Sequence, residues 1–174
     1  MLKIGLISDT HHYLDPQVPE YFSGVDEIWH AGDFGTMDIA RKLEEIAPLT
    51  GVYGNIDGQD IRSKYPMHQR FTKEGVNVWM THIGGNPGRY ALPIKKELED
   101  HPPDLFICGH THILKIARDH DKGDMIYMNP GAAGVHGFHE FRTMVRFGLE
   151  DGKIIEVEVI NLGKRVAKSV TSDV

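Results

Sequence analysis

The chain alternates short apolar runs with amphipathic segments, and this alternation limits the folds that it can adopt. Three apolar runs of strand length, at Leu2–Ile7, Glu27–Ala31 and Leu49–Tyr53, are separated by segments of helical character at Gln17–Ser23 and Met37–Ile46. A helix between two strands carries the chain back to the edge where the first strand began, so that the next strand runs parallel to it. The first half is therefore predicted to fold as βαβαβ around a parallel sheet.

The second half of the chain is richer in strands. Strands are predicted at Met67–Thr72, Val76–Met80, Leu105–Cys108, Leu114–Arg118, Met125–Asn129, Thr143–Leu149 and Ile154–Asn161, and a helix is predicted at Tyr90–Glu99. The sequences DKGD and EDGK favour tight turns between the later strands. This number of strands fits two packed sheets better than one wide sheet. The predicted fold class is therefore α/β, with two packed β-sheets flanked by helices.

Length and charge limit the domain organisation and the partners. A chain of 174 residues without a linker or repeat is predicted to form a single domain over residues 1–174. The formal charge of −6 and the lack of Lys or Arg runs argue against binding of duplex nucleic acid. The apolar run before Asp9 is too short for a signal peptide or a membrane-spanning helix. With Cys108 as the single cysteine, we expect a cytoplasmic protein that contacts no membrane.

Polar side chains follow five of the predicted strands at the point where each strand ends. In open α/β sheets, ligands bind in the crevice outside the carboxyl ends of the strands. Histidines two residues apart in extended chain also point in the same direction. The side chains that are therefore predicted to converge are Asp9, His11, Asp33, Asn55, His82, His110 and His112.

The chemistry of these seven side chains indicates a metal site. Two carboxylates, one amide oxygen and four imidazoles, without a thiolate, suit divalent metals such as Mn, Fe, Zn, Ni or Co. Seven donors exceed the needs of one tetrahedral site, so we expect two sites joined by a bridging carboxylate. Two metals about 3.5–4 Å apart can polarise a phosphoryl oxygen and hold a hydroxide for in-line attack.

The five motifs DTH, GD, GN, TH and GHTH, in this order along the chain, resemble those of the calcineurin-like metallophosphoesterases. The chain is similar over essentially its whole length to the small bacterial and archaeal phosphodiesterases of that superfamily. The resemblance implies a four-layer α/β/β/α sandwich and two ligand sets that share Asp33. These sets are Asp9, His11, Asp33 and His112 for one metal, and Asp33, Asn55, His82 and His110 for the other.

The same resemblance implies the reaction. The expected substrate is a small phosphodiester, which is hydrolysed by a hydroxide held between two divalent metal ions. Manganese is the expected metal, with nickel, cobalt, iron and zinc as alternatives. Asp33, Asn55 and His82 are expected to act in catalysis as well as in ligation. Whether the chain forms a homo-oligomer is left open.

The chain departs from the family pattern directly after Asn55. Many members have a histidine there, which is thought to neutralise or protonate the leaving oxygen, whereas this chain has Ile56 and then Asp57. Asp57 would donate a proton only if its pKa were raised, and a loop or cap aspartate is the favoured interpretation. The similar retromer scaffold subunit also lacks this histidine and uses the fold to bind proteins. The alternative function is therefore a catalytically weak or inactive interaction scaffold.

Other residues near the motifs receive structural or open interpretations. His30 is expected to pack or hydrogen-bond beneath the site rather than to bind metal. The loop at residues 128–142 either brings His136, His139 or Arg142 near the substrate or is a flexible glycine-rich turn. The glycine-rich segment at residues 81–90 is a candidate lid that carries Arg89. We assign no catalytic residue to either loop.

Overall fold

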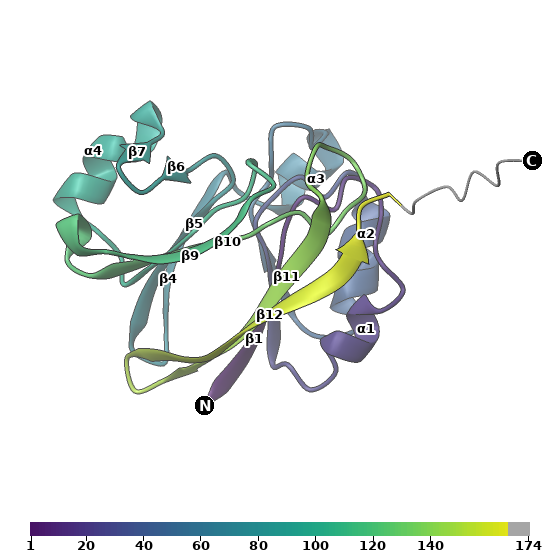
Figure 1. The fold of residues 1–174 in the computed structure, drawn as a ribbon, viewed down its shortest axis with the longest axis horizontal. Coiled ribbons are helices and arrows are strands. Elements are labelled where there is room, and N and C mark those ends of the chain that lie inside the picture. The colour runs from purple at the N-terminus through teal and green to yellow at the C-terminus, as the bar shows by residue number, and fades with distance from the viewer. Residues whose placement is uncertain (167–174) are drawn as a thin grey trace, which may run out of the picture.

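Two five-stranded sheets dominate the computed structural model, which describes residues 1–166 (Figure 1). The first sheet has the strand order β12-β11-β1-β2-β3, and the second has the order β4-β5-β8-β10-β9. Strands β1, β2 and β3 are parallel, as are β5, β8 and β10, and the remaining strands pair antiparallel to their neighbours. The strands are β1 (Leu2–Ile7), β2 (Glu27–His30), β3 (Leu49–Gly51), β4 (His68–Lys73), β5 (Val76–Thr81), β8 (Leu105–Ile107), β9 (Leu114–Asp119), β10 (Met125–Pro130), β11 (Phe141–Glu150) and β12 (Lys153–Lys164).

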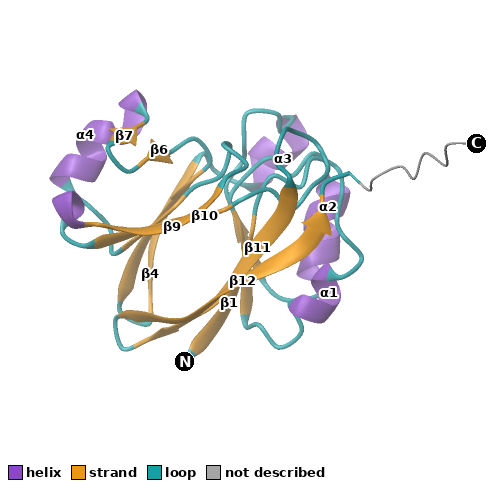
Figure 2. Ribbon diagram, viewed as in Figure 1, coloured by secondary structure: helices purple, strands orange, loops and turns teal. Residues whose placement is uncertain are grey.

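Helices cover the outer face of each sheet, so the molecule has the four layers α/β/β/α (Figure 2). The first sheet is covered by α1 (Val18–Tyr21), α2 (Met37–Glu44) and α3 (Gln59–Lys64). The second sheet is covered by α4 (Leu92–Asp100) and the hairpin of β6 (Gly85–Asn86) and β7 (Arg89–Tyr90). A short 3-10 helix, His120–Lys122, joins β9 to β10. The predicted fold class is confirmed.

Alternating side chains along the strands divide the core into separate apolar clusters. In β1, Ile4 and Leu6 pack between the two sheets, whereas Ile7 packs with the helices. In β5, Val78 and Met80 lie between the sheets, and Trp79 packs on the side of α4. Successive strand residues point to opposite faces, so a strand that is covered on both sides reads as one continuous apolar run.

The sequence predictions differ from the structure in a few elements. Helix α3 was not predicted, because Ile61 is its one buried residue and a single apolar residue gives no helical period. The predicted lid at residues 81–90 contains the β6–β7 hairpin. The predicted Tyr90–Glu99 helix begins two residues later, with Pro93 in its first turn, a position that suits proline. No helix in residues 1–166 is long and apolar enough to cross a membrane.

Candidate metal centre

The predicted ligands converge where the parallel strands of the two sheets end, within the loops at the upper centre of Figure 1. Six of them form two groups, and within each group one potential ligand atom from every residue lies within 4.8 Å of the others. Asp9, His11 and His112 form the first group. Asp33, His82 and His110 form the second group, and Asn55 joins it because its Oδ1 lies 3.0 Å from His110 Nδ1.

Asp9 is the fully buried member of the first group. Its Oδ2 accepts hydrogen bonds from Ser8 Oγ at 2.7 Å and from the His110 backbone N–H at 3.1 Å. Its Oδ1 has no hydrogen-bond partner among the described residues, although His112 Nε2 lies 3.1 Å away. Burial would raise the pKa of this carboxyl, but the adjacent His11 and His112 side chains outweigh that effect and hold the pKa well below its ordinary value. Asp9 therefore offers an ionised, uncommitted oxygen to a cation.

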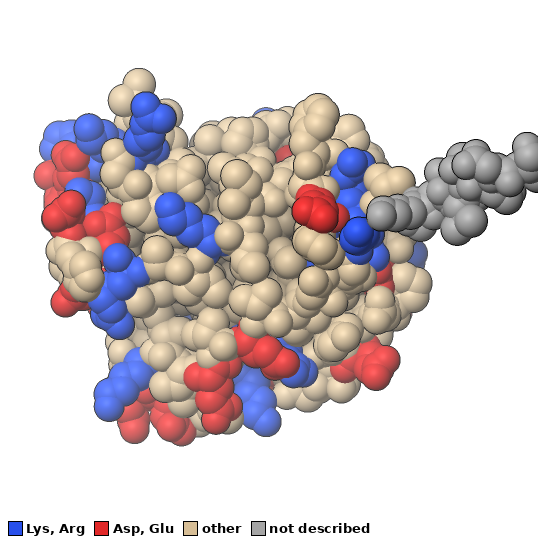
Figure 3. Space-filling view, viewed as in Figure 1, with Lys and Arg blue, Asp and Glu red and all other residues tan. Residues whose placement is uncertain are grey.

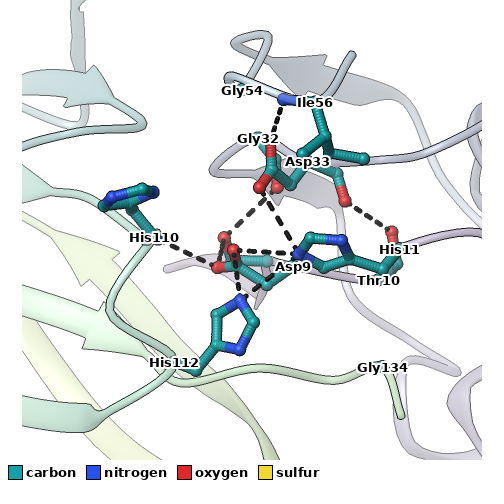
Figure 4. Close-up of polar contacts among 12 residues, drawn as sticks. Asp9, Thr10, His11, Gly32, Asp33, Gly54, Ile56, His110, His112 and Gly134 are labelled. Atoms are coloured by element: carbon teal, nitrogen blue, oxygen red, sulfur yellow. Dashed lines mark hydrogen bonds and ion pairs between the residues drawn. The ribbon is translucent and has the colours of Figure 1, made fainter. Parts of the chain in front are cut away.

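The Nε2 atoms of His11 and His112 point toward one another and toward this oxygen (Figure 4). Their Nε2 atoms are 3.3 Å apart, and His11 Nε2 lies 3.7 Å from Asp9 Oδ1 and 3.4 Å from Asp33 Oδ2. Two neutral imidazoles pair at this distance only if one donates a proton, whereas a cation between them uses both lone pairs. The first group therefore fits a metal ion with mixed nitrogen and oxygen ligands.

His82 is oriented by a backbone contact in the second group. Its Nδ1–H donates to the Ala31 carbonyl at 2.7 Å, which leaves the Nε2 lone pair for a metal. That Nε2 is buried without a hydrogen-bond partner and lies 3.2 Å from Asp33 Oδ2. Burial lowers the pKa of His82, but the adjacent Asp33 carboxylate and the charge of Asp9 outweigh that effect and raise the pKa above its ordinary value. The local field therefore attracts positive charge.

Asp33 lies between the two groups. Its Oδ1 accepts a hydrogen bond from the Ile56 backbone N–H at 3.1 Å, and this contact fixes the carboxylate. Its Oδ2 lies 3.4 Å from His11 Nε2 in one group and 3.2 Å from His82 Nε2 in the other. This position suits a carboxylate that is shared by two metals.

The backbone around the centre is left-handed at most of the ligand positions. Residues with positive φ are Asp9 (52°), His11 (43°), Asp33 (58°), His110 (70°) and His112 (59°). Residues other than glycine adopt this region at a cost, and such strain clusters at functional sites. The prediction of extended chain around the GHTH sequence is therefore wrong. The turns send His110 to the second group and His112 to the first.

Two motif glycines allow the chain to approach the carboxylates closely. A Cβ on Gly54 would lie 2.0 Å from Asp33 Oδ1, and a Cβ on Gly109 would lie 2.7 Å from Asp9 Oδ2. Any side chain at either position would displace a carboxylate. Steric crowding thus explains why glycine precedes Asn55 and His110.

His30 and Asp57 support the site from beneath and do not face it. His30 stacks on Phe34 with ring centroids 3.6 Å apart, and its Nδ1 accepts from the Gly32 backbone N–H. Burial lowers the pKa of His30 to about 3, so the ring is neutral. Asp57 accepts backbone N–H groups of Gly35 and Gly54 with its two oxygens. The structural interpretations of both residues are confirmed.

The loop between β10 and β11 brings two further histidines to the centre. The ring of His136 lies 5.0 Å from that of His11, and the ring of His139 lies 5.2 Å from that of His112, between centroids. Both line the pocket above the ligands. Arg142 instead forms a buried ion pair with Asp15. Arg89, on the β6–β7 hairpin, is exposed and is not among the residues that line this pocket.

The fold and the donor set together define a metallophosphoesterase centre. Residues 2–152 match the calcineurin-like phosphoesterase superfamily domain. The chain therefore belongs to the calcineurin-like phosphoesterase family, as the motif resemblance predicted.

Individual relatives cover three quarters or more of the chain. A probable metallophosphoesterase of Methanothermobacter thermautotrophicus is 31% identical over 174 residues, which cover 97% of this chain and 98% of that protein. A phosphodiesterase of Methanocaldococcus jannaschii is 29% identical over 147 residues, which cover 75% of this chain and 83% of that protein. The structure of Vps29 from Chaetomium thermophilum shares the fold, with a TM-score of 0.72 at 16% identity over 94% of this chain and all of that one.

Proposed function

We propose that the protein is a phosphodiesterase that uses two divalent metal ions. The observation that carries this proposal is the pair of donor groups joined through Asp33, with Asp9 Oδ1 and His82 Nε2 buried and unpaired. Buried polar atoms are normally paired, so two unpaired buried atoms that lie 3.9 Å apart suit cations. Asp9, His11, Asp33 and His112 would hold one ion, and Asp33, Asn55, His82 and His110 would hold the other.

Two bound cations would polarise a phosphoryl oxygen and lower the pKa of a water molecule. The residues of the chain would position these ions. Asp33 would fix their separation, and the Ala31 carbonyl would keep His82 in the ligating tautomer. Asn55 lies at the pocket surface, where its amide would contact the phosphoryl group as charge develops.

The preference for a diester with a good leaving group follows from what the pocket lacks. Ile56 lines the pocket at the position where many relatives carry a proton-donating histidine, and it cannot donate a proton. Of the twelve residues that line the pocket, all in the described part of the chain, none is Lys or Arg. A monoanionic diester with an activated or aryl leaving group suits such a site better than a dianionic monoester. The similarity to a phosphodiesterase supports a phosphodiester substrate.

The chemistry of the site also suggests the metal and the partners. Manganese is proposed as the native metal, with Ni, Co, Fe or Zn as alternatives, because the donors are oxygen and nitrogen without thiolate. The proposed partner is a small phosphodiester, not duplex nucleic acid and not a membrane. The proposed location is the cytoplasm.

A protein-binding scaffold is the second candidate function. The structural similarity to Vps29 and the isoleucine at position 56 favour it. The energetics of the centre oppose it, because burying Asp9, Asp33 and His82 without a cation costs free energy that a scaffold does not recover. We therefore rank it below the enzyme.

Turnover of bis(4-nitrophenyl) phosphate tests the proposal. The metal-free protein is assayed with Mn, Ni, Co, Zn and Mg, and Asp33→Asn serves as the blank. The expected result is metal-dependent release of nitrophenolate that falls by at least about 10²-fold in Asp33→Asn, together with a loss of bound metal. Equal rates for the two proteins with every metal would contradict the proposed enzyme function and would leave the family assignment intact.

A further inference from the structure

Three large apolar side chains stand exposed around the mouth of the metal centre. Ile56 is 41% exposed, Ile113 is 63% exposed and Phe138 is fully exposed. They come from separate loops: after β3, between the GHTH sequence and β9, and between β10 and β11. We call these three residues the apolar rim. All three line the same pocket of about 490 Å³, together with the ligands His11, Asp33, Asn55, His110 and His112.

This arrangement is more than the ordinary scatter of apolar residues on a surface. Single exposed apolar residues are common, but a cluster that frames one concave site indicates binding. The apolar rim also surrounds a polar floor, and a few polar groups within apolar walls are typical of small-molecule sites. Besides the apolar rim and the five ligands, the lining consists of Thr111, His136, Gly137 and His139.

The charge around the pocket further restricts the class of ligands that it can bind. None of the twelve lining residues, all of which are described, is a lysine or arginine. In Figure 3 the acidic and basic side chains gather at the left and lower parts of the face and in a smaller group to the right of the centre, and the surface between these groups is largely uncharged. A substrate with several phosphates would therefore find no Lys or Arg side chain among the lining residues. The nearby Arg62 and Arg165 donate to the backbone carbonyls of Asn55 and His139.

We propose that the apolar rim binds an aromatic group esterified to the phosphate, so that the substrate class is a monoanionic phosphodiester with at least one aromatic ester group. This proposal rests on the proposed function, because the metal centre must hold the phosphoryl group for the ester group to reach the rim. The phosphoryl group and its ester group share one pocket, so the site recognises both ends of such a substrate. Phe138 offers a ring face that is free to stack, and Ile56 and Ile113 offer aliphatic contacts.

Two phosphonate ligands isolate the contribution of the ring. Methyl phenylphosphonate and methyl methylphosphonate carry the same charge and the same methyl ester, and they differ only in phenyl against methyl. Their dissociation constants are measured by titration calorimetry on the manganese-loaded protein. The phenyl compound is expected to bind about tenfold more tightly, the scale that partial burial of a ring supplies.

Variants of Phe138 show whether the rim is the source of this preference. Phe138→Ala is expected to reduce the preference to about twofold, and Phe138→Leu to retain part of it, because leucine restores apolar contact. Leu92→Ala is the matched control, since Leu92 is 85% exposed on α4 and is not among the lining residues. It should leave the preference unchanged. Both altered positions are exposed, so the three variants are expected to fold.

The possible failures are distinguishable. Equal affinity of the wild-type protein for both phosphonates, or a preference that survives Phe138→Ala, would contradict binding of an aromatic group by the apolar rim. Turnover of the nitrophenyl diester would still support the phosphodiesterase function in that case. A lack of metal-dependent turnover in the wild-type protein would overturn the proposed function, and the substrate class with it.

Discussion

Asp9 and His82 each present one buried atom that has no hydrogen-bond partner in the described part of the chain. An unpaired buried polar group costs about 1–3 kcal/mol, and more when the group is charged. The strained backbone at Asp9 and Asp33 adds a similar cost. Both costs fall on residues of the two candidate ligand groups. These residues therefore lower the stability of the metal-free fold, as expected of residues that bind ions.

Removal of individual histidines tests how the ligands divide between two ions. His110→Ala and His112→Ala should each lose one metal per chain, because they belong to different groups. The double variant His82→Ala with His110→Ala should retain one metal, since both changes affect the same group. His82→Ala with His112→Ala should retain none. Metal content by mass spectrometry is the readout, and identical retention in the two double variants would contradict the division.

His30 should make the fold sensitive to acid. Its pKa falls from 6.5 to about 3 in the folded protein because burial disfavours the charged ring. A depressed folded pKa means that stability is fully present above pH 6.5 and is lost as the pH falls toward 3. This group alone should cost about 1.4 kcal/mol of unfolding free energy between pH 7.5 and pH 5.5. Urea unfolding with a chelator present should show this loss in the wild-type protein and lack it in His30→Gln. The same pH dependence in both proteins would contradict the assignment.

At the level of elements, the loop between β3 and α3 occupies the position from which a proton donor would reach the leaving group of the proposed reaction. Ile56 stands where many relatives have histidine, and its backbone N–H holds Asp33. Its side chain is 41% exposed in the pocket, so a histidine would fit without repacking.

Ile56→His should therefore restore a proton donor. Hydrolysis of bis(4-nitrophenyl) phosphate should stay near its starting rate, because nitrophenolate needs little protonation. Diphenyl phosphate has a poorer leaving group and should be cleaved faster, within the roughly 10²–10⁴-fold that a general acid contributes. Ile56→Gln controls for the lost apolar contact. A rate for Ile56→His no higher than that for Ile56→Gln with diphenyl phosphate would count against this role.

The strands and their terminal clusters were predictable because each rests on a local pattern. Apolar runs such as Leu2–Ile7 mark buried strands, and a polar cluster after each run marks the edge where ligands bind. The two-sheet core followed from the number of such runs. The conclusion that Asp9 and His112 meet, although they are 103 residues apart in sequence, needed the family resemblance as well as the pattern.

Other features depend on tertiary contacts that no local pattern carries. The left-handed turns at His110 and His112 are stabilised by contacts such as the bond from the His110 N–H to Asp9. The approach of His136 and His139 to the centre depends on where β10 and β11 place their connecting loop. Arg142, in the same stretch of sequence, turns away because Asp15 pairs with it.

At the scale of the whole molecule, the centre belongs to both sheets. Asp9, Asp33 and Asn55 follow strands of the first sheet, and His82, His110 and His112 follow strands of the second. The apolar cluster between the sheets, which includes Leu6, Met80 and Ile107, fixes the sheets relative to each other. Neither sheet alone supplies either complete ligand group, so metal binding requires the assembled sandwich.

Titration of Mn²⁺ into metal-free protein is the most direct measurement of the central claim, that this assembled centre is a two-metal phosphodiesterase. Diester hydrolysis and bound metal are followed in the same samples at protein concentrations well above the dissociation constants. The account predicts that turnover rises to a plateau at two equivalents of metal per chain. A plateau at one equivalent would contradict the two-metal centre, and two bound equivalents without turnover would contradict the enzyme.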